Sequence, residues 1–151
     1  LFDAVDFDFC DGLITNTVFE EIGNDALDFS GSTAKIDNII VNNVHDKVIS
    51  AGEESYITIL DTQIKNSNFG LVSKDRSEIL ANNIEFKNVN YIAAAYQKKS
   101  EFGPSKIKIN NHRVIEGDSE FIAGNNSQIN LGTDKILNEI NEKLIKDISN
   151  F

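Results

Sequence analysis

The sequence lacks methionine, disulfide partners and long apolar runs. Its 151 residues include no Met, one Pro and one Cys. The single Cys10 excludes a disulfide framework and a Cys-rich zinc site, and we expect it to be a small buried side chain. No apolar stretch approaches the roughly 18 residues of a membrane span, and no signal peptide is visible. Because the chain lacks Met and opens inside a strand-like pattern, we interpret it as a piece of a longer protein.

The charge and the missing motifs narrow the classes of function. A formal net charge of −10 argues against nucleic acid and against insertion into or binding to an anionic membrane. It is compatible with metal cations or a sugar polymer. The chain contains no P-loop, no GxSxG and no HExxH motif. Its length suits one domain with a real core, to which ten Phe contribute.

What the sequence does contain is a repeat of about 22 residues. Two apolar positions flank a central residue in the pairs Val5/Phe7, Leu27/Phe29, Val48/Ser50, Leu71/Ser73 and Ala93/Ala95. A second track keeps step with the first, with Ile14-x-Asn16-x-x-Phe19 returning in sets that begin at Ile36, Ile59, Ala81 and Ile109. The last interval of this track is longer, which places an insertion at residues 97–105.

Stacked coils explain this repeat, because short alternating strands cannot each bury a face alone. Every coil would add parallel strands about 4.8 Å from the last. The second track carries a column of short polar residues at Asn16, Asn38, Asp61, Asn83 and Asn111. Such residues tolerate a left-handed backbone, and stacked Asn side chains bond one another. We therefore predict an all-β, single-stranded parallel β-helix of five to six coils over residues 1–132, with an asparagine ladder.

Three of these coils carry a resemblance to a known family. "NDALDFSGSTAKIDNIIVNNV", "DKVISAGEESYITILDTQIKNS" and "FGLVSKDRSEILANNIEFKNV" resemble right-handed parallel β-helix repeats of the pectate-lyase-like superfamily. The resemblance covers residues 3 to about 131, and the usual hand of parallel crossovers agrees with a right-handed coil. The superfamily includes lyases, hydrolases, epimerases, tailspikes and adhesins, so the resemblance predicts the fold and not one activity. The Gly-His-Gly and paired-Asp signature of its pectin hydrolases is absent.

The last segment, residues 133–151, has a different pattern. A helical stripe is formed by Ile136, Leu137, Ile140, Leu144, Ile145 and Ile148. Thr133 suits an N-cap, and Asp134 suits the first turn. We predict an amphipathic α-helix that caps the open end of the last coil. The alternatives are an oligomer contact or a connector to a further domain.

Acidic residues stand where the repeat turns side chains outward. The predicted outward columns are Asp6, Asp28, Ile49, Val72, Ala94 and, two residues on, Asp8, Ser30, Ala51, Lys74, Tyr96. Stacked acids repel unless they are compensated. Because Ca²⁺ takes several oxygen ligands in flexible geometry, we predict Asp6, Asp8 and Asp28 as calcium ligands. A carboxyl with a raised pKa or an acidic strip solvated by water and nearby Lys are the alternatives.

Cations and acids meet beside this face, in the turn columns that contain Glu53, Asp75, Arg76, Gln97 and Lys98. By resemblance to β-helix lyases, which use Lys or Arg as the base in uronate elimination, Lys74 or Lys98 would be the base and Arg76 its partner. Tyr96 would stack on a sugar ring or donate a proton. The predicted substrate-binding residues are Asp28, Ser30, Glu53, Asp75, Tyr96 and Gln97. A ladder of exposed ion pairs is the alternative.

Two functions fit these features. The first is a carbohydrate-active β-helix that binds an acidic polysaccharide along one sheet face, or cleaves it in a lyase-like reaction; whether it is an enzyme stays open. The second is a non-catalytic structural or adhesive segment of a larger surface or secreted protein. Either function predicts an extracellular or cell-surface location. Ca²⁺ is the predicted cofactor and a polysaccharide the predicted partner.

Overall fold

The computed structural model describes residues 2–117 and 120–136. These residues form strands, turns and bends, and among them no helix is long and apolar enough to cross a membrane. The strands are β1 (Val5–Asp8), β2 (Asp11–Ile22), β3 (Leu27–Ser30), β4 (Thr33–Gly52), β5 (Tyr56–Lys74), β6 (Glu78–Tyr96), β7 (Lys106–Ile115), β8 (Glu120–Ala123), β9 (Gln128–Leu131) and β10 (Asp134–Ile136).

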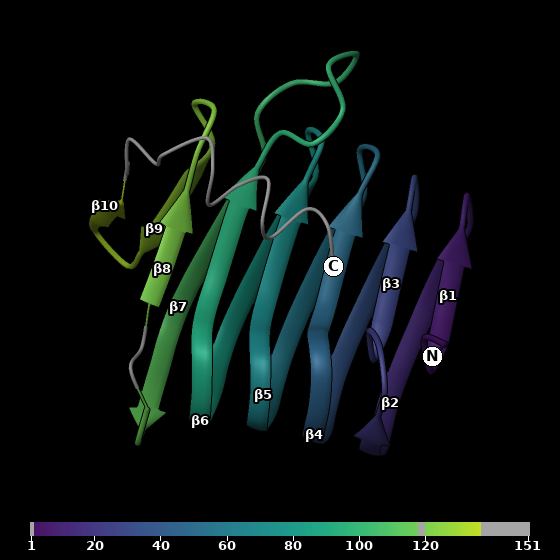
Figure 1. Ribbon diagram of the computed structural model, residues 1–151, viewed down its shortest axis with the longest axis vertical. Helices are drawn as coiled ribbons and strands as arrows, with labels where there is room; N and C mark the ends of the chain where they lie inside the picture. Colours follow the sequence, from purple (N-terminus) through teal and green to yellow (C-terminus); the bar gives the residue numbers. More distant parts are fainter. Residues whose placement is uncertain (1, 118–119, 137–151) are drawn as a thin grey trace.

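The strands stack into a parallel solenoid, which confirms the predicted class of fold. Along the stack the order is β1, β3, β4, β5, β6, β7, β9 and β10, while β2 pairs with β4 and β8 pairs with β6. Every pairing is parallel except that of β10 with β9, which is antiparallel. Figure 1 shows the coils side by side. There are about six coils of about 22 residues, as the repeat predicts.

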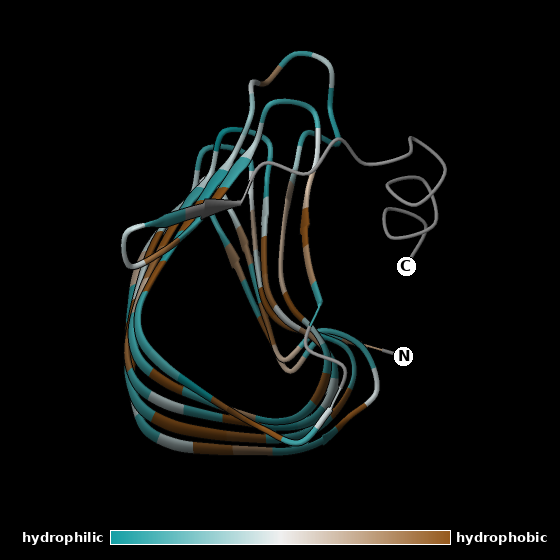
Figure 2. Cartoon of the chain, turned by 90° about the vertical axis from the view of Figure 1, so that its left-hand side faces the viewer, coloured by the Kyte–Doolittle hydropathy of each residue, from teal (hydrophilic) through white to brown (hydrophobic). Residues whose placement is uncertain are grey.

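Residues with positive φ divide each coil into three faces. In β4, for example, Asn38 and Asn43 have φ of 54° and 60°. Figure 2 shows each coil bending sharply between its faces. Face 1 consists of β1, β3, residues 47–52, 69–74 and 91–96, and β8. Face 2 consists of residues 11–15, 33–37, 56–60, 78–82 and 106–110, and β9. Face 3 consists of residues 17–22, 39–44, 62–67, 84–89 and 112–115.

The core lies inside the coil, where like positions stack on one another. Ile36 and Ile59 pair across neighbouring coils and are both 0% exposed, and the rings of Phe7 and Phe29 stack with centroids 5.0 Å apart. Burying side chains of this size contributes about 1.5–3 kcal/mol each. In the first coil Phe7 and Phe19 stay half-buried, because only one described coil packs against them.

The predicted asparagine ladder is confirmed at the corner between faces 2 and 3. All five residues of the predicted column have positive φ. The Asn38 Nδ2 donates to Asn16 Oδ1 at 2.6 Å, and the Asn83 Nδ2 donates to Asp61 Oδ1 at 2.5 Å. The next member, Asn111, donates to Asn82 instead of Asn83. The ladder is therefore built from pairs and is not one continuous chain.

Two further polar ladders were not predicted. At the corner between faces 3 and 1, Asn88 Nδ2 donates to Asn66 Oδ1 at 2.9 Å. At the corner between faces 1 and 2, the backbone N–H of Ser55 donates to the buried Ser77 Oγ at 3.0 Å. Equivalent serines recur at Ser32, Ser55, Ser77, Ser105 and Ser127. This repeat is visible in the sequence and would have identified the buried corner.

Cys10 is the counterpart of these serines in the first coil, and its N–H donates to Ser32 Oγ at 3.1 Å. The prediction that its side chain is buried is wrong, because the thiol is exposed. The physical reason is its place in the first coil, where only one described coil lies against it.

The end of the described chain differs from the predicted helix. Gly132 has φ of 59° and lets the chain turn back, so that β10 pairs antiparallel with β9. Thr133 and Asp134 therefore do not begin a helix. The unpaired edge of β9 offers hydrogen bonds that these residues satisfy as a strand. The remainder of the predicted helix, residues 137–151, lies outside the described residues. The predicted insertion at 97–105 is confirmed as the loop between β6 and β7.

Candidate functional site

The outward columns of face 1 differ from the prediction in the third coil. Ile49 and Ala51, predicted outward, are both 0% exposed within the core. On face 1 the coils pair in one constant register through Val5, Leu27, Ile49, Leu71 and Ala93. The prediction matched Leu27 to Val48 instead of Ile49, and an error of one residue turns the side chains of a strand to the other face. Both candidates are apolar, so alternation alone did not choose between them. The outward columns are Asp6, Asp28, Ser50, Val72, Ala94 and Asp8, Ser30, Gly52, Lys74, Tyr96.

Two acids of the first two coils accept hydrogen bonds from the backbone of the next coil. Asp3 Oδ1 accepts from the Asp25 N–H at 3.0 Å, and Asp25 Oδ1 accepts from the Lys47 N–H at 3.0 Å. Asp6 is exposed beside Asp28, and its pKa is raised by partial burial and by the neighbouring carboxylates. Within the described part of the chain no three acids, His or Cys are grouped to hold a metal ion. The calcium site of Asp6, Asp8 and Asp28 stays a prediction.

A buried charge cluster lies next to these acids and was not predicted. Lys47 Nζ lies 3.4 Å from Asp25 Oδ1 and also forms an ion pair with Asp46. All three residues are buried. Burial and the charges of Asp46 and Asp28 raise the pKa of Asp25 to about 6, although Lys47 opposes the shift. The error of one residue in the predicted register hid this cluster, because the observed pairing of β3 with β4 places Lys47, and not Asp46, beside Asp25.

The side chain of Lys74, the predicted base, lies against a glycine of the preceding coil. A Cβ on Gly52 would lie 3.6 Å from Lys74 Cε, so the missing side chain leaves room for the lysine stem. Burial lowers the pKa of Lys74, and the charge of Asp28 opposes this. A lysine with a lowered pKa is a better base near neutral pH. Lys74 and Asp28, both predicted site residues, are thus close enough to interact electrostatically.

Tyr96 does not present its ring to solvent. It is 0% exposed and packs with Phe69, Val72, Ala94 and Ile122 on the outer side of face 1. Burial raises the pKa of its hydroxyl. In this structure the ring is not available to stack on a sugar, although its neighbour Lys74 is only half-buried.

The charged rim between faces 1 and 2 is a set of ion pairs and loop contacts. Arg76 pairs with Glu54 at 2.6 Å rather than with Glu53, and Glu53 pairs with Lys99. Asp75 Oδ1 accepts from the N–H groups of Lys98 and Lys99, each at 2.7 Å. Gln97 Nε2 donates to Phe102 O at 2.6 Å. Asp75 and Gln97 therefore fix the 97–105 loop, while the Lys98 side chain is exposed.

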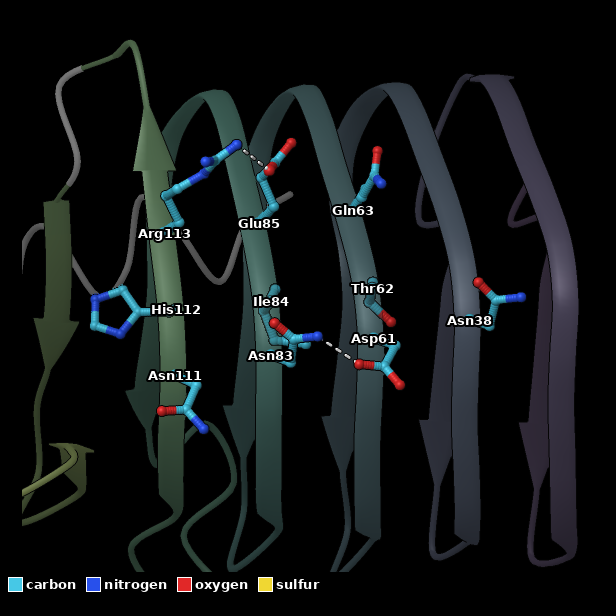
Figure 3. Close-up of a pocket in the computed structure, with 10 residues that line it drawn as sticks. All are labelled: Asn38, Asp61, Thr62, Gln63, Asn83, Ile84, Glu85, Asn111, His112 and Arg113. Atoms are coloured by element: carbon cyan, nitrogen blue, oxygen red, sulfur yellow. Dashed lines mark hydrogen bonds and ion pairs between the residues drawn. The ribbon is translucent and has the colours of Figure 1, made fainter.

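A groove lies at the corner of faces 2 and 3, over the asparagine ladder. Its volume is about 730 Å³. Figure 3 shows that the side chains lining the groove project from neighbouring coils. The lining residues are Asn38, Asp61, Thr62, Gln63, Asn83, Ile84, Glu85, Asn111, His112 and Arg113. Arg113 pairs with Glu85 at 2.8 Å, so its charge is compensated within the groove. The ladder was predicted, but the sequence contains no sign that this corner is hollow. We call this groove the corner groove.

A smaller groove of about 440 Å³ lies on face 2 and is lined by Tyr56, Thr58, Leu80, Lys106 and Lys108, among others. Tyr56 is 52% exposed, which makes it an accessible aromatic ring beside polar side chains.

Comparisons with known proteins found no match: no family model, no curated protein and no solved structure matches the chain. The class of the protein, a parallel β-solenoid, therefore rests on the structure, and the likeness to the pectate-lyase-like superfamily stays a prediction.

Proposed function

We propose that the chain is a carbohydrate-binding parallel β-helix that holds an extended, uncharged glycan in the corner groove. The observation that carries this proposal is the groove of about 730 Å³, whose polar lining is repeated from coil to coil. Amide groups both donate and accept hydrogen bonds, which suits sugar hydroxyls. Neighbouring coils lie about 4.8 Å apart, a spacing close to the length of one sugar ring in an extended chain.

Charge favours a neutral glycan over the acidic one that the sequence alone predicts. The groove contains Arg113, but Glu85 neutralises it, and Asp61 adds a negative charge. The whole chain carries −10, so a polyuronate would be repelled. The resemblance to the right-handed pectate-lyase-like superfamily supports a polysaccharide ligand and an extracellular or cell-surface location as parts of the same proposal.

Titration calorimetry with soluble oligosaccharides tests this function. We expect at least one neutral series, such as xylo-, manno-, cello- or chito-oligosaccharides, to bind with an affinity that rises until the glycan fills the groove. Oligouronates should bind more weakly at low ionic strength. Gln63→Ala, which removes one outward amide of the groove, should weaken binding about fivefold, as expected for one lost hydrogen bond of about 1 kcal/mol.

Tyr56→Ala on face 2 is the matched control and should leave the affinity unchanged. Loss of binding in Tyr56→Ala with full binding in Gln63→Ala would place the glycan on face 2 and overturn the corner groove. Absence of binding to every oligosaccharide would contradict the proposal and favour a structural or adhesive segment.

Lys74 supports a second candidate function, a uronate lyase. Its lowered pKa and its proximity to Asp28 favour proton abstraction by a neutral amine. Incubation with alginate, pectate and glycosaminoglycans, with and without Ca²⁺, should then raise the absorbance near 235 nm, an approximate wavelength for unsaturated uronates, and Lys74→Ala should abolish the rise. No absorbance change with any of these polymers would rule this candidate out.

A further inference from the structure

A second polar groove lies at the corner between faces 3 and 1, on the opposite edge of face 3 from the corner groove. It consists of two adjoining hollows of about 350 Å³ and 200 Å³, which share Asn43 and His45. Successive coils contribute amide side chains to its lining, namely Asn43, Asn66, Asn68, Asn88 and Asn90. We call it the amide groove.

One column of these amides is explained by the backbone alone. Asn66 and Asn88 have φ of 49° and 54°, and Asn is one of the few residues that adopt this left-handed conformation readily. Asn88 Nδ2 also donates to Asn66 Oδ1 at 2.9 Å. The corner of the coil therefore accounts for Asn66 and Asn88 without any ligand.

The neighbouring column has no such explanation. Asn68 and Asn90 lie two residues beyond the corner and do not have positive φ. Asn90 Nδ2 donates to Asn68 Oδ1 at 3.1 Å, and this pair is exposed. Such a bond adds little net stability, because water competes for both groups. The fold therefore does not require amides at these two positions, and recognition of a ligand would explain them.

Both amides keep hydrogen-bonding groups that the described chain does not use. A side-chain amide offers two N–H donors and one acceptor oxygen with two lone pairs. Asn68 Nδ2 and Asn90 Oδ1 have no partner among the described residues. The pairing of β5 with β6 places these amides in neighbouring coils, about 4.8 Å apart. A sugar chain along the solenoid axis would therefore meet donors and acceptors at that spacing.

The charge of the amide groove favours a neutral ligand. Among its described lining residues, Glu21 is the only acid and none is Lys or Arg. Glu21 Oε2 accepts from Asn43 Nδ2 at 2.8 Å. These residues therefore provide no permanent cation for an acidic sugar, whereas their amides suit the hydroxyl groups of a neutral one.

We propose that the amide groove is a further binding site for a neutral glycan. This site takes the same class of ligand as the corner groove and so rests on the proposed function. The corner residues of the two grooves, such as Asp61 and Asn66, are five residues apart in β5, which corresponds to about 16 Å. Two glycan chains can then lie side by side along the two edges of face 3. One molecule would thereby join two glycan chains.

Titration calorimetry with tetrasaccharides of the xylo-, manno-, cello- and chito-series tests this site. The parent chain should bind two tetrasaccharides of at least one series. Asn68→Ala/Asn90→Ala should weaken one site about thirtyfold, as expected for two lost hydrogen bonds, while Gln63→Ala weakens the other. Asn130→Ala, which removes an amide from the groove on face 2, is the matched control and should leave both sites unchanged.

Light scattering with a soluble polymer of the same series measures the joining of chains, using xylan, mannan, hydroxyethyl cellulose or glycol chitin. The parent chain should form large particles with the polymer, and Asn68→Ala/Asn90→Ala should not. Binding that remains in the corner groove of this variant shows that it is folded.

The pattern of responses separates this site from the proposed function. A single site that responds to Gln63→Ala and not to Asn68→Ala/Asn90→Ala would overturn the amide groove and leave the corner groove intact. A single site with the opposite response would support the amide groove and contradict the corner groove. Absence of binding to all four series would overturn both.

Discussion

Single residues at the corners of the coil carry most of the local conformational cost. A left-handed backbone costs about 1–2 kcal/mol for an ordinary residue, and Asn and Asp reduce this cost through local hydrogen bonds. Most non-glycine residues with positive φ in the described chain are Asn or Asp. The corner residues were predictable because their chemistry is local. The pairing between their side chains was not, since Asn111 bonds to Asn82 and not to Asn83.

Asp61 is the weak member of the asparagine ladder. Its carboxylate accepts from Asn83 but has no proton to donate to Asn38. Asp61→Asn keeps a residue that tolerates the φ of 45° and adds this donor. We expect stabilisation of about 0.5–1 kcal/mol, measured as a higher urea midpoint with an unchanged slope.

Asp11→Asn is the control for the change in charge, because Asp11 is exposed at the start of β2. Asp11→Asn should change the urea midpoint by less than half as much as Asp61→Asn does. An equal gain in both variants would mean that the lower net charge, and not the ladder, stabilises the chain.

Elements were predictable where the pattern allows one register and were wrong where it allows two. The tracks through Ile14 and Ile36 were assigned in the correct register. On face 1 the match of Leu27 to Val48 in place of Ile49 reversed the predicted third coil, because a strand has a side-chain period of two and an error of one residue inverts it. β10 was predicted as a helix start, since its local pattern does not reveal the open edge of β9 beside it.

Two glycines within the strands allow a paired test of packing. A Cβ on Gly70 would lie 2.6 Å from Ile92 O and 2.9 Å from Phe86 Cε1. Gly70→Ala should therefore destabilise the chain by about 1–3 kcal/mol. On Gly52 the nearest atoms are 3.6 Å and 3.8 Å away, so Gly52→Ala should be neutral or slightly stabilising.

Thermal and urea unfolding of the two glycine variants, compared with the parent chain, gives the measurement. Equal stability of the two variants would contradict the close stacking of coils three to five on face 1.

The whole molecule is acidic, and its electrostatics predict how stability depends on pH. Folding raises the pKa of Asp25 from 3.8 to about 6, chiefly by burial. An acid with a raised pKa binds its proton more tightly in the folded state, so its contribution is full below about pH 3.8 and is lost as the pH rises through about 6. The raised pKa of Asp6 acts in the same direction. We expect greater stability at pH 5 than at pH 7.

Asp25→Asn should reduce this pH difference, because the amide oxygen still accepts from the Lys47 N–H while the titrating proton is gone. Urea unfolding between pH 5 and 7 measures the effect, and Asp11→Asn should keep the full difference. A parent chain that is more stable at pH 7 would show that the Asp25–Lys47 attraction outweighs burial.

The sequence by itself determined the parallel solenoid, the coil length, the core columns outside the third coil of face 1, and the left-handed asparagine corner. These features follow from the period of the repeat and from local chemistry, and both recur in every coil. Only the tertiary structure decided which side chains share a surface. It buried Tyr96, brought Lys47 beside Asp25, paired Arg76 with Glu54 and hollowed the corner groove. The physical reason is that contacts between coils depend on register, and a one-residue shift leaves the composition of a repeat almost unchanged while it reverses every side chain that follows.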